Sequence, residues 1–120
     1  SVHTRIVNSI FDGSPKGLYN EGISSNILEN VMFNCSEQNV YSASPSKMEQ
    51  NNVYEEDPLL ETEGGRRFQL SDRSPARNLG AYFPEYREDI KTDIRKVTRR
   101  LRHPDLGCYA VPRGMAVFVR

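Results

Sequence analysis

The chain has 120 residues, no tryptophan and a formal net charge of zero. Leu, Ile, Val and Phe make up only about 23% of it, little more than in disordered chains, so the composition excludes a large apolar core. Because few apolar side chains must offset the entropy lost on folding, we predict a mostly disordered or irregular chain. Its ordered parts would be one amphipathic α-helix and a C-terminal β-hairpin, which is a small α+β fold at most.

Charge is segregated along the chain although it sums to zero. Residues 49–63 carry six acids and no base, whereas residues 95–103 carry five Lys or Arg and no acid, so the two segments produce local fields of opposite sign. Cys35 and Cys108 make neither a disulfide framework nor a zinc site, and we expect two reduced thiols. No apolar run approaches the ~18 residues that a membrane span needs, so any membrane anchor is expected outside these residues.

Residues 1–47 are predicted to be a largely disordered segment with short helical propensity. The stretch 2–11 favours a short helix or nothing stable, and turn signals around Pro15 then break the chain. A second short helix is expected over 25–33, where four apolar residues share one helical face: Ile27, Leu28, Val31 and Met32. No internal repeat is evident.

Residues 48–82 are predicted to be a disordered linker that is first acidic and then basic. The stretch 34–58 is polar and has no sustained periodicity, as linkers typically do. Gly64 and Gly65 mark a second loop. The composition changes near residue 48, because acids cluster only after it.

Residues 83–120 are predicted to hold the amphipathic helix and the hairpin. Pro84 suits a first helical position, acids crowd the first turns of 84–103 and bases the last ones, as the helix dipole favours, and Pro104 ends the helix. Four apolar residues at spacings of four, three and four predict one helical face: Ile90, Ile94, Val97 and Leu101. The apolar stretches 108–111 and 115–119 flank Pro112-Arg113-Gly114 and predict the hairpin.

The basic end of this helix admits three interpretations. Lys96, Arg99 and Arg100, beside the apolar face, would bind an anionic membrane surface or a partner protein. They would otherwise form a solvated face while the apolar face packs on the hairpin. Nucleic acid is an unlikely partner, because no base-reading pattern or aromatic platform accompanies the basic residues.

The most specific short pattern is Glu55-Glu56-Asp57-Pro58-Leu59-Leu60. It resembles the acidic dileucine sorting signal of endosomal and lysosomal membrane proteins, in which an acid stands four residues before a Leu-Leu pair. Here Glu55 is that acid, and Leu59 and Leu60 are the pair. The resemblance implies binding to clathrin adaptor complexes, with two exposed leucines entering a pocket beside a basic patch.

Two Ser-Pro pairs are candidate proline-directed phosphorylation sites. Ser44 and Ser74 are each followed by proline and, three places after the serine, by a basic residue. A phosphate would add about −1.5 to −2 charges to an accessible loop. Ser-Pro is also an ordinary turn dipeptide, so a structural role is the alternative.

Catalysis has little support in the sequence. His3 and His103 lie at opposite ends of the chain and have no Ser, Cys or carboxylate at a recognisable spacing, and no phosphate-binding glycine loop or metal motif occurs. We expect no enzyme, no cofactor and no metal. The sequence predicts a cytoplasmic region of a trafficking membrane protein, at the cytosolic face of endosomal or lysosomal membranes, or else a small soluble regulatory protein that binds its partner through the amphipathic helix.

Overall fold

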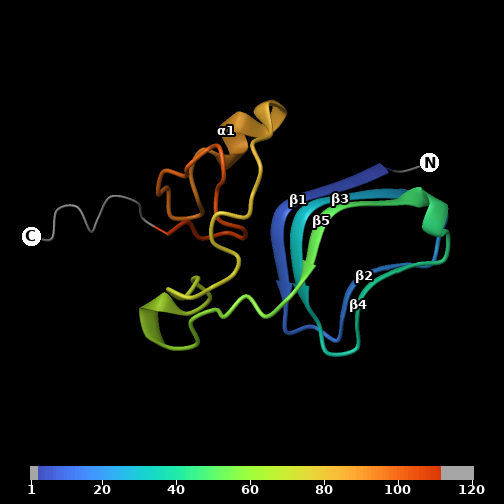
Figure 1. Ribbon diagram of the computed structural model, residues 1–120, viewed down its shortest axis with the longest axis horizontal. Helices are drawn as coiled ribbons and strands as arrows, with labels where there is room; N and C mark the ends of the chain where they lie inside the picture. Colours follow the sequence, from blue (N-terminus) through green and yellow to red (C-terminus); the bar gives the residue numbers. More distant parts are fainter. Residues whose placement is uncertain (1–2, 112–120) are drawn as a thin grey trace, which may run out of the picture.

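The structure, a computed structural model, describes residues 3–111 and is built mainly from parallel β-strands. Strands β1 (His3–Asp12), β3 (Ser25–Asn34) and β5 (Met48–Glu55) form one sheet in that order, and β2 (Lys16–Asn20) pairs with β4 (Gln38–Ser42) in a second. All of these pairs are parallel. The chain passes from one sheet to the other and returns one strand further on, which produces the coils of a β-solenoid (Figure 1).

Each coil of the solenoid is 22 residues long. Residues paired between neighbouring strands lie 22 positions apart, as three pairs illustrate: His3 and Ser25, Lys16 and Gln38, Asn26 and Met48. The prediction that the chain lacks an internal repeat is therefore wrong. Stacking one coil on the next buries apolar side chains that a single coil would leave exposed, so a chain with few apolar residues still gains a buried apolar interior.

One asparagine in each coil adopts a left-handed backbone conformation. The φ angles are 48° at Asn8, 57° at Asn30 and 55° at Asn52, and asparagine tolerates this region better than most non-glycine residues. A single such residue changes the phase of the strand, as a bulge does. Leu28 precedes Asn30 and Phe33 follows it, and both point into the solenoid. The two residues are five positions apart, so in a strictly alternating strand they would point to opposite faces.

This change of phase explains why the short helices expected over 2–11 and 25–33 are wrong. The described part of the first stretch, 3–11, lies in β1, and the second stretch lies in β3. Strict alternation would mark them as strands, but the asparagine interrupts the alternation in mid-strand. The apolar residues then fall at spacings of three and four, which mimic a helical face.

Two apolar clusters stabilise the molecule. The first fills the solenoid, where Leu28, Val31 and Phe33 are fully buried, and the rings of Phe11 and Phe33 stack with centroids 4.8 Å apart. The second lies on the outer face of the three-stranded sheet. There Met32 packs against residues of the C-terminal part of the chain, namely Leu70, Ala76 and Leu106.

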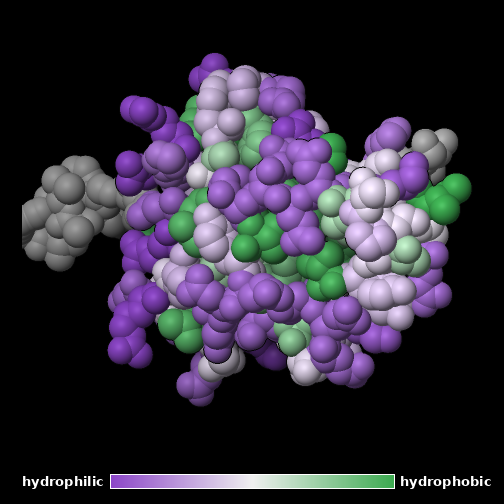
Figure 2. Space-filling model, turned by 45° about the vertical axis from the view of Figure 1, so that its right-hand side comes forward, coloured by the Kyte–Doolittle hydropathy of each residue, from purple (hydrophilic) through white to green (hydrophobic). Residues whose placement is uncertain are grey.

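Residues 56–111, which we call the C-terminal layer, cover the outer face of the three-stranded sheet (Figure 1). The layer has little regular structure, with η2 (Gly64–Arg66), η3 (Pro84–Tyr86) and α1 (Arg87–Ile90), whereas η1 (Pro45–Lys47) lies at a corner of the solenoid. Figure 2 shows apolar side chains gathered in a recess near the middle of the molecule, surrounded by hydrophilic residues. Solenoid and layer thus share one apolar junction.

The predicted fold class, mostly disordered with one amphipathic helix, is wrong. The described chain is an ordered domain with two parallel sheets and one short α-helix. The polar stretch 34–58, expected to lack structure, contains β4 and β5. Polar residues suffice there because the backbone ladder to β2 and β3 provides the order, and few of their side chains need to be buried.

The helix predicted over 84–103 is replaced by η3 and α1, which end at Ile90. The buried carboxylate of Asp93 accepts hydrogen bonds from the backbone N–H groups of Arg95 and Val97. Lys96 has a positive φ of 66°. An aspartate that binds its own local backbone competes with helical hydrogen bonding, and this local turn has displaced the helix.

The predicted hairpin lies largely outside the described residues, which end at Val111. Its first stretch, 108–111, is irregular. Within residues 3–111, no helix has the length and apolar character needed to cross a membrane.

Candidate functional site

A groove opens where the strands of the three-stranded sheet end against the C-terminal layer. It consists of two adjoining cavities of about 400 and 170 Å3 that share Asp12, Leu60 and Phe68. We call it the strand-end groove. Its remaining lining comes from both parts of the molecule: Ile10, Asn34, Asp57, Leu59, Glu61, Thr62, Arg67, Leu70, Leu106, Gly107, Cys108 and Tyr109.

The strand ends supply the polar groups of the groove. Asp12 and Asn34 are the last residues of β1 and β3 and lie side by side in register, and Asn34 Nδ2 donates to Asp12 Oδ1 at 2.9 Å. Asp57 follows the end of β5 and accepts the N–H of Leu59 at 2.8 Å. Because parallel strands end at the same edge of a sheet, side chains far apart in the sequence converge here.

A small loop, residues 59–71, brings an aromatic ring to the groove. The loop is closed by hydrogen bonds from the Phe68 N–H to Glu61 O (2.8 Å) and from the Ser71 N–H to Leu59 O (3.1 Å). Phe68 has a φ of 71° and is 58% exposed, and the guanidinium of Arg67 lies 4.9 Å from its ring centroid. A bulky residue at positive φ costs on the order of 1–3 kcal/mol. The loop therefore holds the exposed Phe68 ring on a backbone conformation that is unfavourable for the stability of the fold.

The groove carries a net negative charge. Three carboxylates line it, on Asp12, Asp57 and Glu61, against two guanidinium groups, that of Arg67 in the lining and that of Arg66, whose Nη2 lies 3.8 Å from Glu61 Oε2. A phosphate or another anion would be repelled there. A neutral ligand rich in hydroxyl groups, or a cationic one, fits the charge. Within residues 3–111, no three His, Cys, Asp or Glu side chains come close enough together to hold a metal ion.

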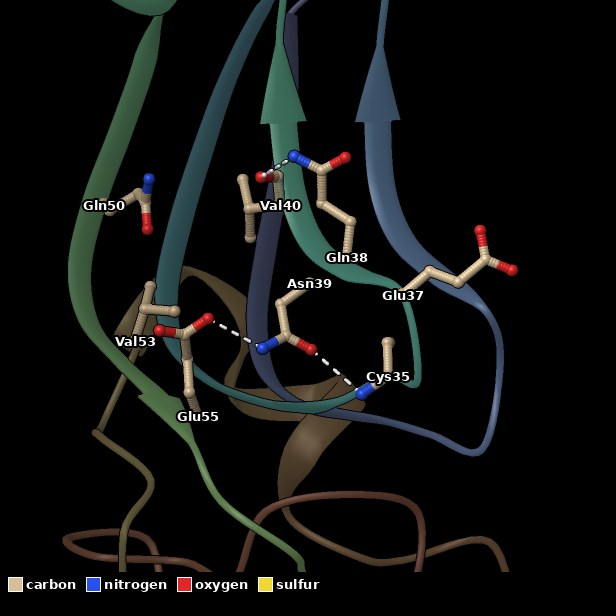
Figure 3. A pocket seen from close by; sticks show the side chains of 8 residues that line it. All are labelled: Cys35, Glu37, Gln38, Asn39, Val40, Gln50, Val53 and Glu55. Carbon is tan, nitrogen blue, oxygen red and sulfur yellow. Dashed lines mark hydrogen bonds between the residues drawn. The ribbon is translucent and has the colours of Figure 1, made fainter.

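Another cavity, of about 500 Å3, lies between β4 and β5 at one end of the solenoid (Figure 3). Its polar side chains satisfy one another: Asn39 donates to Glu55 Oε2 at 2.7 Å and accepts the Cys35 N–H at 2.9 Å. Burial raises the pKa of the Cys35 thiol, and the charge of Asp12 raises it further, so the cysteine is a weak nucleophile. We interpret this cavity as a polar cap on the solenoid.

Side-chain bonds fasten the C-terminal layer to the solenoid. Asn8 Nδ2 donates to Ala81 O and Asn8 Oδ1 accepts the Ala81 N–H, both at 3.0 Å, while Asn30 Nδ2 donates to Leu79 O at 2.9 Å. Two of the three left-handed asparagines thus bind one extended segment of the layer. They fix this segment of the layer relative to strands β1 and β3.

An ion-pair cluster makes a second attachment. The Arg5 guanidinium donates to Glu29 and to Glu85 and lies near the rings of Phe83 and Tyr86. The hydrogen bond from Arg5 lowers the pKa of the Glu85 carboxyl. Because both partners are exposed, this contact orients the layer more than it stabilises it.

Buried charges organise the layer itself. Burial alone would raise the pKa of Asp93, but the N–H groups of Ala110, Val97 and Arg95 donate to its carboxylate and bring the pKa below its usual value. Burial lowers the pKa of Arg99, whose guanidinium donates to the backbone carbonyls of Thr92, Asp105 and Gly107. These groups serve the fold and lie outside the groove.

The resemblance to a sorting signal falls on a folded segment. Glu55 is exposed and bonded to Asn39. Leu59 is 40% exposed, whereas Leu60 is half-buried, bridges to Leu70 and packs in the outer apolar cluster. Leu59 is therefore accessible to a partner, whereas Leu60 is held in the outer apolar cluster.

The two candidate phosphorylation sites differ in exposure. Ser44 is half-buried at the start of η1. Ser74 is only 6% exposed, and its hydroxyl accepts the Ala76 N–H at 3.1 Å. A kinase would have to open this turn before it reached Ser74.

The residues predicted to form one helical surface are dispersed. Ile94 is 68% exposed, whereas Ile90, Val97 and Leu101 are half-buried. The basic residues separate too, because Arg99 is bound to the backbone while Lys96 and Arg100 are exposed.

The sequence contains a signal for the repeat that positions the groove. Within residues 3–55, identical residues recur 22 positions apart in five pairs and one triplet: Phe11 and Phe33, Ser14 and Ser36, Tyr19 and Tyr41, Ser24 and Ser46, Val31 and Val53, and Asn8, Asn30 and Asn52. A search for a fixed period would have found it. Phe68 and Arg67 carry no comparable signal, because a short loop places them.

The chain matches no protein-family model, no curated protein and no solved structure.

Proposed function

We propose that the protein is a non-catalytic binding module that takes up a neutral, hydroxyl-rich ligand, such as an oligosaccharide, in the strand-end groove. The observation that carries the proposal is the exposed ring of Phe68 beside the hydrogen-bonded pair of Asp12 and Asn34. The fold holds all three at one edge.

The polar pair suits hydroxyl groups. A carboxylate accepts hydrogen bonds and an amide both donates and accepts them, so Asp12 and Asn34 can bind two neighbouring hydroxyls. Each hydroxyl offers one donor and two acceptor lone pairs. Uncharged donors of this kind meet no repulsion from Asp57 and Glu61, whereas an anionic sugar does.

The ring suits the apolar face of a sugar. C–H groups pack on the face of an aromatic ring, and most ligand pockets combine apolar walls with a few placed polar groups. Leu59 and Leu60 extend the apolar wall beside Phe68. The two adjoining cavities offer room for a chain rather than a single small solute.

Calorimetric titration with neutral oligosaccharides, and with matched uronate-containing ones, tests the proposal. The native chain should bind a neutral member of the panel and discriminate against the uronates. Phe68→Ala should weaken binding about 3- to 10-fold, as expected for loss of one aromatic contact. Tyr82→Ala, which removes an exposed ring outside the groove, is the matched control and should bind like the native chain. Tight binding of the uronates, or equal binding by Phe68→Ala, would refute the proposal.

The sorting function remains a second proposal, favoured by the exposure of Leu59 and Glu55. An adaptor would need both leucines, so the bridge between Leu60 and Leu70 would have to open first. Replacing Leu59 and Leu60 with Ala should relocate a protein that carries this region. An unchanged distribution would rule out the signal.

A further inference from the structure

Three cations lie on the solvent side of the C-terminal layer, in the segment 96–102. Exposure alternates strictly along this segment: Val97, Arg99 and Leu101 are half-buried, whereas every even position is exposed. Alternate side chains of an extended chain point to opposite sides, and the exposure follows that rule. Apart from Thr98, the exposed positions are all basic, and we call them the basic row: Lys96, Arg100 and Arg102.

Among the described residues, the basic row has no acidic partner. Residues 94–104 contain no Asp or Glu, and within residues 3–111 no carboxylate oxygen lies within 4.0 Å of the three side chains. Other cations of this region are bound within the protein, because Arg95 pairs with Asp93 and Arg99 donates to the backbone. Like charges close together repel each other. The row therefore gives the fold no ion pair, and its charge is available to an external anion.

Buried groups hold the basic row in place from beneath. The Asp93 carboxylate accepts the N–H groups of Arg95 at 2.7 Å and Val97 at 2.8 Å. Arg99 is fixed on both its main chain and its side chain, since its N–H donates to Lys91 O and its Nη2 donates to Gly107 O, both at 2.8 Å. A surface that is ordered before it binds loses less conformational entropy on binding.

An exposed aliphatic side chain belongs to the same turn. Ile94 is 68% exposed, and its N–H donates to Cys108 O at 3.1 Å. The segment, drawn in orange, lies on the side of the layer that faces away from the strands (Figure 1). An anionic bilayer accommodates both features, because its headgroups attract the cations and its acyl boundary takes up the aliphatic group. A hydrated polyanion would complement the charge and leave Ile94 in water.

We propose that the basic row and Ile94 form a docking surface for the anionic face of a lipid bilayer. The sequence groups Lys96, Arg99 and Arg100 on one helical surface, whereas the structure keeps the first and third, turns Arg99 inward and adds Arg102. Attachment through so few side chains is reversible. The surface is independent of the strand-end groove, whose net charge has the opposite sign.

Vesicle co-sedimentation of the full chain tests the proposal. Vesicles of phosphatidylcholine with one third phosphatidylserine should sediment the protein, pure phosphatidylcholine should not, and added salt should release it. Lys96→Gln, Arg100→Gln and Arg102→Gln should each lower the partition coefficient about 5-fold. Ile94→Ser should lower it about 10-fold. Because these side chains are exposed, the variants should keep the denaturation midpoint of the native chain.

Two exposed residues elsewhere supply matched controls. Lys47→Gln removes an exposed cation of the solenoid, and Ile23→Ser removes an aliphatic side chain that is 72% exposed; both variants should partition like the native chain. Equal losses in these controls, or unchanged partition of the basic-row variants, would overturn the proposal. Unchanged partition of Ile94→Ser would also overturn it, since charge alone would then explain binding. Binding to heparin or DNA without binding to the vesicles would assign the row to a soluble polyanion instead.

Discussion

The solenoid and the C-terminal layer reach order by different means. The solenoid repeats one pattern, so each interior side chain stacks on its equivalent in the next coil, as Phe11 does on Phe33. The layer has no pattern and depends on single side chains that bind backbone groups, above all Asp93 and Arg99. A repeat spreads stability over many similar contacts, whereas an irregular layer concentrates it in a few.

The largest effect is expected inside the solenoid. Phe33→Ala removes a fully buried ring and should lower the free energy of unfolding by about 3–5 kcal/mol, measured by chemical denaturation. Phe68→Ala, in the exposed loop, should change it by no more than about 0.5 kcal/mol. Similar losses of unfolding free energy in the two variants would contradict the conclusion that Phe33 stabilises the fold whereas Phe68 serves binding.

A smaller and more local effect is expected in the layer. Asp93→Ala leaves the N–H groups of Arg95, Val97 and Ala110 without their acceptor and should cost about 3 kcal/mol, at about 1 kcal/mol per lost bond. Amide exchange should show loss of protection over 92–111, while β3 stays protected. Asp89→Ala, at an exposed position, is the control. Equal loss of protection in β3 would show that the two regions unfold together.

The left-handed asparagines should contribute unequally to the free energy of unfolding, although their φ angles are similar. Asn30→Ala combines the cost of a Cβ at positive φ with loss of the bond to Leu79, for about 2 kcal/mol in total. Asn30→Gly keeps the backbone conformation and loses only the bond. Asn52→Ala, at an exposed position, should show the backbone cost alone, about 1 kcal/mol. Thermal unfolding of the three variants separates the two contributions.

The smallest effect is a response to acid. Because hydrogen bonding holds the pKa of Asp93 below its usual value, its contribution to stability is complete above about pH 4, near the unfolded pKa, and is lost as the pH falls through the lowered folded pKa. Spectra of the layer should therefore change below pH 4, and Asp93→Asn should reduce that change. An acid transition of unaltered size in Asp93→Asn would assign it to other carboxylates.

Prediction from sequence failed for a specific physical reason. The helices are predicted from amphipathic periodicity. Because Asn30 shifts the alternation of β3 in mid-strand, Leu28, Val31 and Met32 acquire helical spacing. The stripe Ile90, Ile94, Val97 and Leu101 has real helical spacing, but Asp93 lies within it and binds the local backbone instead. In each case one polar residue, Asn30 or Asp93, determines the local backbone conformation against the structure that the periodicity predicts.

The groove was beyond the reach of local patterns. Asp12, Asn34 and Asp57 converge only because parallel strands end together, and that requires knowledge of the 22-residue period. The period is visible in the spacing of Asn8, Asn30 and Asn52. The exposure of Phe68 is a property of a loop and follows from no pattern.

The grip of Asn8 and Asn30 on residues 79–81 sets a limit on how the protein can change in length. Neighbouring coils are about 4.8 Å apart, and Leu79 and Ala81, two residues apart in the chain, bind the asparagines of two successive coils. A duplicated coil inserted between β1 and β3 would double the gap and leave one of the two asparagines facing the wrong peptide. The number of coils in the solenoid can therefore change only if the segment 79–81 of the layer changes in length with it.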